Sequence, residues 1–183
     1  LGSTQVAING RLAPLLSVSP AQINLQVPFD ITGTEAEIAV STPAGSSSPV
    51  KVPVIDIQPG IFFDPASGLG AILLNSNSAS TAVQPARAGD FLQIYATGLG
   101  PVLPTAVAGF PAAFTPPVRT TTLPEVTIAG FPAPVLFAGL APGFAGLYQV
   151  NVQVPESVPP GRQNVVLSMN GLQSNTVQVN IGP

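Results

Sequence analysis

One pattern of residues occurs twice in this chain and constrains its fold more than any other feature. Near the N-terminus it reads Gln5-Val-Ala-Ile-Asn-Gly-Arg-Leu-Ala-Pro-Leu-Leu-Ser-Val18, followed by Ala21-Gln-Ile-Asn-Leu-Gln-Val-Pro28. Residues 125–155 repeat it, so that Ile8-Asn9-Gly10 corresponds to Ile128-Ala129-Gly130, and Gln26-Val27-Pro28 to Gln153-Val154-Pro155. Self-similarity on this scale indicates that one structural unit is built twice.

The repeated unit has the alternation of β-strands. Along residues 22–27 amides and apolar side chains point to opposite faces, with Gln22, Asn24 and Gln26 on one face and Ile23, Leu25 and Val27 on the other. Asn9-Gly10 and Asn170-Gly171 are hairpin turn signals. The 22 prolines and 18 glycines argue against long helices. The sequence therefore predicts an all-β protein made of two tandem immunoglobulin-like β-sandwiches related by an internal repeat.

Composition along the chain suggests the domain boundaries. We expect a first sandwich over residues 1–63, a linker over 64–88 and a second sandwich over 89–183. The linker is rich in Ser, Asn and Ala, and its one apolar run, Ala71–Leu74, is expected to dock as a short strand. Within the second sandwich, residues 101–124 are rich in Pro, Ala and Thr and read as an extended crossover on the surface.

The two copies are unequal. The second begins with an alternating strand over residues 91–97, and nothing before residue 4 corresponds to it. The N-terminal sandwich is therefore predicted to lack one strand. Such a sandwich exposes unpaired backbone groups and a strip of apolar core, and an open strand edge is a template for pairing with another chain. Three extended segments are candidate donors of the strand: residues 1–5, 64–80 and 102–124.

Charge and composition exclude several functions. Charged residues make up only 7% of the chain, against about 25% in an average globular protein. The net charge of −3 and five scattered basic residues argue against nucleic-acid binding. No apolar run approaches the roughly 20 residues of a membrane-spanning helix, so no membrane insertion is expected. The neutral, amide- and hydroxyl-rich composition suggests an extracellular or cell-surface protein, and the start in mid-pattern suggests a mature or cut product.

The residues needed for enzyme chemistry are scarce. The chain has no histidine or cysteine, which removes the usual general base and thiol nucleophile. Lys51 is the only lysine, and a solvated strand position explains it better than a Ser–Lys dyad. Glu35 and Glu37 share a strand face as surface acids, and a glycosidase would need more sugar platforms than Tyr95 and Tyr148. We therefore expect no enzyme and no cofactor.

A few residues in or beside the linker could in principle bind calcium. Oxygen ligands lie at Asp64, Asn75, Asn77 and Asp90. Their spacing matches no standard calcium loop, so ordinary turn-forming residues account for them better, and no metal site is predicted.

Several apolar side chains are candidates for an interaction surface. Leu140 and Phe144 lie on the insertion 139–146, and Phe110 and Phe114 on the Pro-rich crossover. An exposed apolar patch suggests a contact surface, whereas the same residues could fold back onto their own sandwich. Val6 and Ile8, which share one face of the first strand, complete the predicted interface. The Gln and Asn rows at 22/24/26 and 149/151/153 are interpreted as solvated faces, with amide contacts between subunits as the alternative.

Four ordered motifs resemble a known family. They are Pro20-Ala-Gln-Ile-Asn-Leu-Gln-Val-Pro28, Gln58-Pro-Gly-Ile-Phe62, Ile94-Tyr-Ala-Thr-Gly-Leu-Gly100 and Ala141-Pro-Gly-Phe-Ala-Gly-Leu-Tyr-Gln-Val-Asn-Val-Gln-Val-Pro155. Together they are similar to the uncharacterised C-terminal domain family of acidobacterial secreted proteins. The resemblance implies tandem immunoglobulin-like sandwiches at the end of large extracellular proteins, and no activity. Members carry a further strand, resembling residues 91–100, before the first sandwich, and this chain departs from them by lacking it.

Two functions follow as hypotheses. The first is an extracellular structural subunit that self-assembles with other copies of itself, as a filament, by edge-strand pairing or strand exchange. The second is a binding module from the C-terminus of a large secreted protein, with an extracellular protein or a glycan as its ligand.

Overall fold

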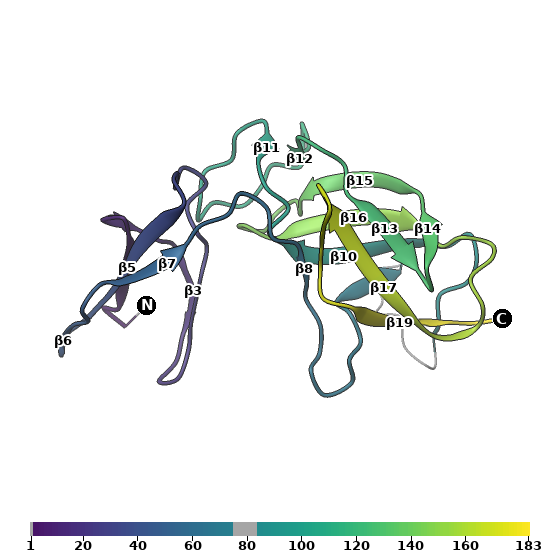
Figure 1. The fold of residues 1–183 in the computed structure, drawn as a ribbon, viewed down its shortest axis with the longest axis horizontal. Coiled ribbons are helices and arrows are strands. Elements are labelled where there is room, and N and C mark those ends of the chain that lie inside the picture. Colours follow the sequence, from purple (N-terminus) through teal and green to yellow (C-terminus); the bar gives the residue numbers. More distant parts are fainter. Residues whose placement is uncertain (1, 75–83) are drawn as a thin grey trace.

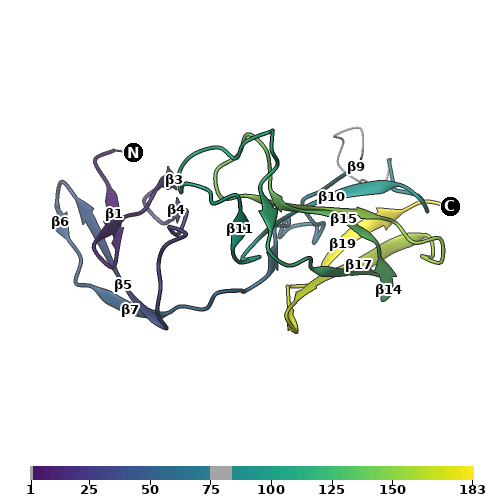
Figure 2. The same ribbon diagram turned by 90° about the horizontal axis from the view of Figure 1, so that it is seen from above.

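The computed structural model describes residues 2–74 and 84–183. Within these residues the protein consists of nineteen strands, and it contains no helix long and apolar enough to cross a membrane. Figures 1 and 2 show two lobes of unequal size, joined by an extended segment between residues 54 and 59. We refer to residues 2–57 as the N-terminal lobe and to the described residues from 58 onward as the C-terminal lobe. The predicted all-β sandwich class is confirmed.

The N-terminal lobe consists of one five-stranded sheet and one hairpin. The sheet contains β1 (Gln5–Ile8), β2 (Arg11–Leu12), β5 (Glu35–Thr42), β6 (Gly45–Ser46) and β7 (Val50–Pro53), with β5 at its centre. The hairpin is formed by β3 (Leu15–Val18) and β4 (Ile23–Leu25), which pair only with each other among the described strands. The buried core of this lobe is small: Ile8, Ala13 and Ala36 lie among half-buried apolar neighbours such as Leu25 and Ile38.

The C-terminal lobe packs two complete sheets over a large core. One sheet contains β13 (Glu125–Ile128), β14 (Phe131–Ala133), β17 (Gly161–Met169), β18 (Leu172–Gln173) and β19 (Val177–Ile181). The other runs in the order β11 (Val102–Leu103), β12 (Arg119–Thr120), β15 (Val135–Leu140), β16 (Tyr148–Gln153), β10 (Phe91–Thr97) and β8 (Gly60–Ile61), and β9 (Ile72–Leu74) also pairs with β10. The alternation of the strands buries one face of each, as with Leu92 and Ile94 of β10 and Val150 and Val152 of β16.

The five-stranded sheets of the two lobes share one strand order. The order β2-β1-β5-β6, with β7 beside β5, matches β14-β13-β17-β18, with β19 beside β17. Each sheet begins with a two-residue hairpin: the turn Asn9-Gly10 joins β1 to β2, and Ala129-Gly130 joins β13 to β14, with positive φ at all four residues. The internal repeat stays a prediction, but the shared strand order allows each strand of one lobe to be compared with the strand in the same place in the other.

Part of the expected linker belongs to the C-terminal lobe. β9 comes from the apolar run at 71–74 and pairs with β10 over Leu92–Ile94, while β8 pairs with the far end of β10. Ile72, Leu74 and Ala86 are buried in the core of this lobe. The apolar run therefore adds a strand beside β10, and Ala86 bridges to Ile181 of β19 in the other sheet. Of residues 64–88, the stretch 75–83 lies outside the described residues.

Candidate functional site

The free edge of β4 is the candidate site. Within the β3–β4 hairpin, Ser19 N–H donates to Gln22 O at 2.8 Å, and Gln26 N–H donates to Pro14 O at 2.9 Å. Backbone groups alternate in direction along an antiparallel strand. Since residues 22 and 26 use their backbone groups toward β3, the N–H and C=O groups of Ile23, Leu25 and Val27 point to the other side. Within residues 2–74 and 84–183, no strand pairs with that side.

The C-terminal lobe shows how the equivalent edge looks when it is filled. β16 corresponds to β4, and Gln153 N–H donates to Pro134 O just as Gln26 N–H donates to Pro14 O. The far side of β16 is covered by β10, in a register that joins Leu92 to Val152 and Ile94 to Val150. Beyond the strand end, Val154 N–H donates to Asp90 O at 2.8 Å. Among the described residues, no strand lies along β4 as β10 lies along β16.

The apolar side chains along the outer edge of β4 are less covered than those of β16. Val150, Val152 and Val154 are 0%, 0% and 1% exposed. Their counterparts Ile23 and Leu25 are only half-buried, and Val27 is 55% exposed. The β4 edge thus combines outward backbone donors and acceptors with apolar side chains at alternate positions, which is the surface that an added strand pairs with.

The far end of the β4 edge is fixed to the C-terminal lobe by Gln26. This side chain is only 7% exposed, and its Oε1 accepts a hydrogen bond from Gly109 N–H at 2.8 Å. A Cβ on Gly146 would lie 2.6 Å from Gln26 Cδ, and a Cβ on Gly109 would lie 2.8 Å from the Pro14 ring. Because Gly146 and Gly109 have no side chains, Gln26 and Pro14 can occupy the space beside them. Alternation alone predicted a solvated amide at residue 26, and its burial is a finding of the structure.

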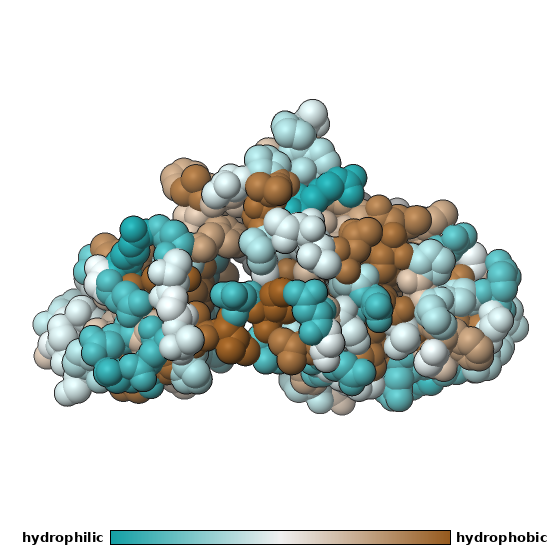
Figure 3. Space-filling view, turned by 45° about the horizontal axis from the view of Figure 1, so that its top comes forward, coloured by the Kyte–Doolittle hydropathy of each residue, from teal (hydrophilic) through white to brown (hydrophobic). Residues whose placement is uncertain are grey.

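A cavity of about 550 Å³ lies beside this contact between the lobes. Its lining comes from residues 11–14 and 28–30 of one lobe and from residues 105–108 of the other: Arg11, Leu12, Pro14, Pro28, Phe29, Asp30, Thr105, Ala106, Val107 and Ala108. Arg11 and Asp30 form an ion pair there, with both side chains more than half exposed. Figure 3 shows apolar surface in the region between the lobes.

Three of the predicted interface residues are gathered on two loops that pack together. Ala112 N–H donates to Phe144 O, and Gly143 N–H donates to Ala112 O, both at 2.9 Å. This pairing brings the crossover onto the insertion, with the Phe114 ring lying over Gly143. Phe110, Phe114 and Phe144 are 68%, 75% and 56% exposed. We call these three phenylalanines the aromatic patch.

The other three predicted interface residues are buried. Leu140 ends β15 and is 2% exposed, because the strand continues further into the insertion than the glycines suggested. Val6 and Ile8 are each 2% exposed, and they face inward from the central part of the sheet, between β2 and β5. The expectation that these three side chains are available for contact is corrected, since they belong to the lobe interiors.

Two of the expected donor segments are already used within the C-terminal lobe. Residues 64–74 supply β9, and 102–124 supply β11 and β12 together with the buried residues Val102, Ala112 and Val118. Residues 2–4 precede β1 and include no buried side chain. Residues 1 and 75–80 lie outside the described part of the chain.

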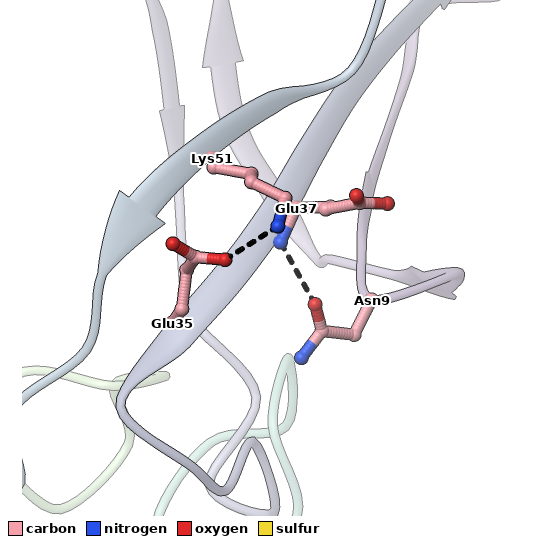
Figure 4. A network of polar contacts seen from close by, with 4 residues as sticks. All are labelled: Asn9, Glu35, Glu37 and Lys51. Carbon is pink, nitrogen blue, oxygen red and sulfur yellow. Dashed lines mark hydrogen bonds and ion pairs between the residues drawn. The ribbon is translucent and has the colours of Figure 1, made fainter.

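The acidic and basic residues considered for catalysis form surface contacts. Figure 4 shows Lys51 of β7 beside Glu35 of β5, with Nζ 2.8 Å from Oε1 and both side chains more than half exposed. Glu37 N–H donates to Asn9 Oδ1 at 2.8 Å, which ties the β1–β2 turn to β5. Lys51 therefore occupies a solvated, ion-paired strand position.

The carboxylates considered for calcium shape local turns. Asp64 accepts hydrogen bonds from the Ser67 hydroxyl at 2.6 Å and from Ala66 N–H at 3.0 Å, and these bonds lower its pKa. Asp90 accepts a hydrogen bond from Arg87 N–H at 2.8 Å. Asn75 and Asn77 lie outside the described residues. Among the described ones, no group of three His, Cys, Asp or Glu is placed to hold a metal ion.

The amide rows form short ladders along their own strands. Gln22 Nε2 donates to Asn24 Oδ1, and at the corresponding place in β16 Gln149 Nε2 donates to Asn151 Oδ1 at 2.8 Å. The rows diverge at their ends, where Gln153 Nε2 donates to Gly89 O and Gln26 crosses to the other lobe. The side-chain amides of Gln149 and Gln153 thus donate to partners within the C-terminal lobe.

Comparison with solved structures shows a weak structural likeness. No family model and no curated protein matches this sequence. Among solved structures, the chain is similar to the Bacteroides ovatus mixed-linkage glucan utilization locus protein SGBP-B in complex with a mixed-linkage heptasaccharide, with a TM-score of 0.36 and 13% sequence identity. The likeness covers 98% of this chain and 37% of that one. A likeness with this TM-score does not indicate what this chain binds.

Proposed function

We propose that this protein is an extracellular structural subunit that self-assembles by taking up an extended strand from a neighbouring copy at the β4 edge. The observation that carries the proposal is the contrast between β4, which has no partner on its outer side within the described residues, and β16, which β10 covers. Each backbone hydrogen bond gained there contributes about 0.5–1.5 kcal/mol, and covering the apolar strip adds to it. The proposal includes membership in the acidobacterial C-terminal domain family that the four sequence motifs resemble.

Repetition of such a contact gives an extended assembly. The acceptor edge lies on the N-terminal lobe, so a donor located elsewhere on the subunit makes the contact heterologous, which produces rings or open filaments. The low charge of the chain supports close packing of identical subunits, because few like charges oppose it.

A substitution at Val27 tests the proposal. Val27→Pro removes the outward N–H while leaving the Gln26–Pro14 hydrogen bond in place, and Pro is tolerated where a strand N–H faces outward. Val27→Lys keeps the N–H but places a charge on the edge, which natural edge strands use against pairing. Val27→Thr is the matched control, since it keeps both the N–H and the β-branched shape.

The measurement is the mass of the particle across a dilution series, by light scattering, with negative-stain electron microscopy of the same samples. We expect filaments for the unchanged chain and for Val27→Thr, and a mass near one chain for Val27→Pro and Val27→Lys. A monomeric unchanged chain, or filaments that persist in both the Pro and the Lys variants, would contradict assembly through this edge.

The second candidate function is a binding module for an extracellular protein or a glycan. The aromatic patch favours it, because its three phenylalanines are more than half exposed on two loops that pack together, and exposed apolar side chains are typical of contact sites. A monomer that gains thermal stability when an extracellular protein or a glycan is added, and loses that gain in Phe110→Ser with Phe114→Ser, would support this function instead.

A further inference from the structure

We infer that the strand received at the β4 edge is an uncharged segment of another polypeptide with the side-chain alternation of β10, and that it lies antiparallel to β4 in the register of the β10–β16 pair. This inference rests on the proposed strand uptake at β4, and it adds which strand fits and how it lies. The argument uses the C-terminal lobe as a template, because β4 and β16 occupy the same place beside β3 and β15.

The register follows from the hydrogen-bond directions. If Gln26 is the counterpart of Gln153, then Leu25 corresponds to Val152 and Ile23 to Val150. In the C-terminal lobe Leu92 pairs with Val152 and Ile94 pairs with Val150. The donor's inward residues therefore lie opposite Leu25 and Ile23. The pair Ala96↔Tyr148 places the donor's C-terminal end beside Ala21. A carbonyl in the position of Asp90 would then accept from Val27 N–H, as Asp90 O does from Val154 N–H.

The alternation follows from burial. The inward side chains of β10, Leu92, Ile94 and Ala96, are each 0% exposed, while Gln93 and Tyr95 on the other face are half-buried. On the outer face the Tyr95 hydroxyl donates to Gln93 Oε1 at 3.2 Å, within one row of polar side chains. The N-terminal lobe presents the same requirements: Ile23 and Leu25 need apolar neighbours on the core side, and Gln22 and Asn24 need polar neighbours outside.

The absence of charge is also required by the site. The acidic side chains that follow β4 most closely in the chain, Asp30 and Glu35, are already paired, with Arg11 and Lys51 respectively. A lysine or carboxylate at an inward position of the donor would be buried without a partner, which costs far more than the strand pairing returns.

A synthetic peptide with the sequence of residues 91–97, acetylated so that the acetyl carbonyl takes the position of Asp90 O, serves as the probe, added to the full chain and followed by NMR of the backbone amides. The control peptide has the same composition, with residues 92 and 93 exchanged and residues 94 and 95 exchanged, so that Gln and Tyr point inward. We expect saturable binding of the first peptide, at least tenfold weaker binding of the control, and at least tenfold weaker binding of the first peptide to Val27→Pro than to Val27→Thr.

Spin labels on the peptide determine where and how it lies. A nitroxide at the peptide C-terminus is expected to broaden the amide signals of Ala21 and Gln22, and one at the N-terminus those of Gln26 and Val27. The reverse pattern would show parallel addition, and broadening of the β16 signals would show displacement of the chain's own β10. Either outcome, or equal binding of the two peptides, would overturn the inference.

The inference and the proposed function fail separately. Filaments that depend on Val27, together with no binding of the peptide, would keep the proposed function and reject the β10-like strand. A chain that binds the peptide in the expected register but stays monomeric at every concentration would keep the inferred strand and reject self-assembly.

Discussion

At the scale of single residues, the contact between the lobes depends on the size of two glycines. Gln26 reaches across from the N-terminal lobe and accepts a hydrogen bond from Gly109 N–H, and its side chain occupies the space beside Gly146. Any side chain at 146 has to displace the amide. The same residue ends the β4 edge, so the position of that edge relative to the C-terminal lobe depends on a single buried amide.

Substituting Gly146 tests this contact, with Gly130 as the matched control. Both have positive φ, +67° and +81°, where an L-residue costs about 1–2 kcal/mol. A Cβ at 146 meets Gln26, whereas a Cβ at 130 meets nothing within 4 Å. We expect Gly146→Ala to lower the free energy of unfolding by about 1 kcal/mol more than Gly130→Ala, because it also breaks the hydrogen bond from Gly109. Equal losses in urea unfolding would contradict the role of Gln26.

Tyr148 makes stability depend on alkaline pH. Its hydroxyl donates to Gly100 O, and burial raises its pKa from 10.0 to about 12. In the folded protein the neutral form is favoured, so the stabilisation is fully present below pH 10 and is lost as the pH rises through about 12. We expect the free energy of unfolding to fall by roughly 1–2 kcal/mol across this range. In Tyr148→Phe this part of the fall should disappear, and an unchanged slope would refute the assignment.

At the scale of strands and hairpins, the fold divides into parts that local sequence predicts and parts that depend on distant contacts. Alternation and turn chemistry are local, so the strand at 91–97 and the hairpins at Asn9-Gly10 and Asn170-Gly171 were predictable. The inclusion of β9 in the C-terminal lobe was not, because its identity depends on pairing with β10, some twenty residues further on. Leu140 was misplaced for a related reason: glycine and proline around it suggested a loop, while pairing with Tyr148 extends β15 through it.

The candidate site was predictable to the extent that the two copies could be compared. The absence of a counterpart for residues 91–97 predicts an open edge, and within the described residues β4 has no partner on its outer side. The second part of the site, the contact of Gln26 with Gly109, was not predictable. It joins residues 83 positions apart, and no periodic pattern in the sequence indicates it. An amide in a polar row looks the same in sequence whether it faces water or a second lobe.

At the scale of the whole molecule, stability is unevenly divided. The C-terminal lobe contains a continuous buried core drawn from both of its sheets, whereas the buried cluster of the N-terminal lobe consists of Ile8, Ala13 and Ala36. Small domains bury a smaller share of their surface on folding, so their stability is marginal. The contact through Gln26 and the packing of Phe29 against the C-terminal core therefore contribute to holding the N-terminal lobe folded.

Separating the lobes tests this division. We expect a fragment of residues 58–183 to fold cooperatively by itself, because it contains β8, β9 and every strand that pairs with them. A fragment of residues 1–57 should be largely unfolded in the absence of a bound strand, as measured by circular dichroism and amide chemical-shift dispersion. A stable monomeric fold of residues 1–57 would show that the missing strand is not needed.

The extended connection between the lobes has a mechanical consequence. The chain passes from β7 to β8 through residues 54–59, and the contact of Gln26 with Gly109 is a second link between the lobes. In a filament under tension, force would pass through both routes, and the small N-terminal core would yield before the C-terminal lobe. A strand lying along β4 would resist that force by shear, with its backbone hydrogen bonds loaded together. The least stable part of the free subunit would thus become, once joined, the part that transmits tension to the next.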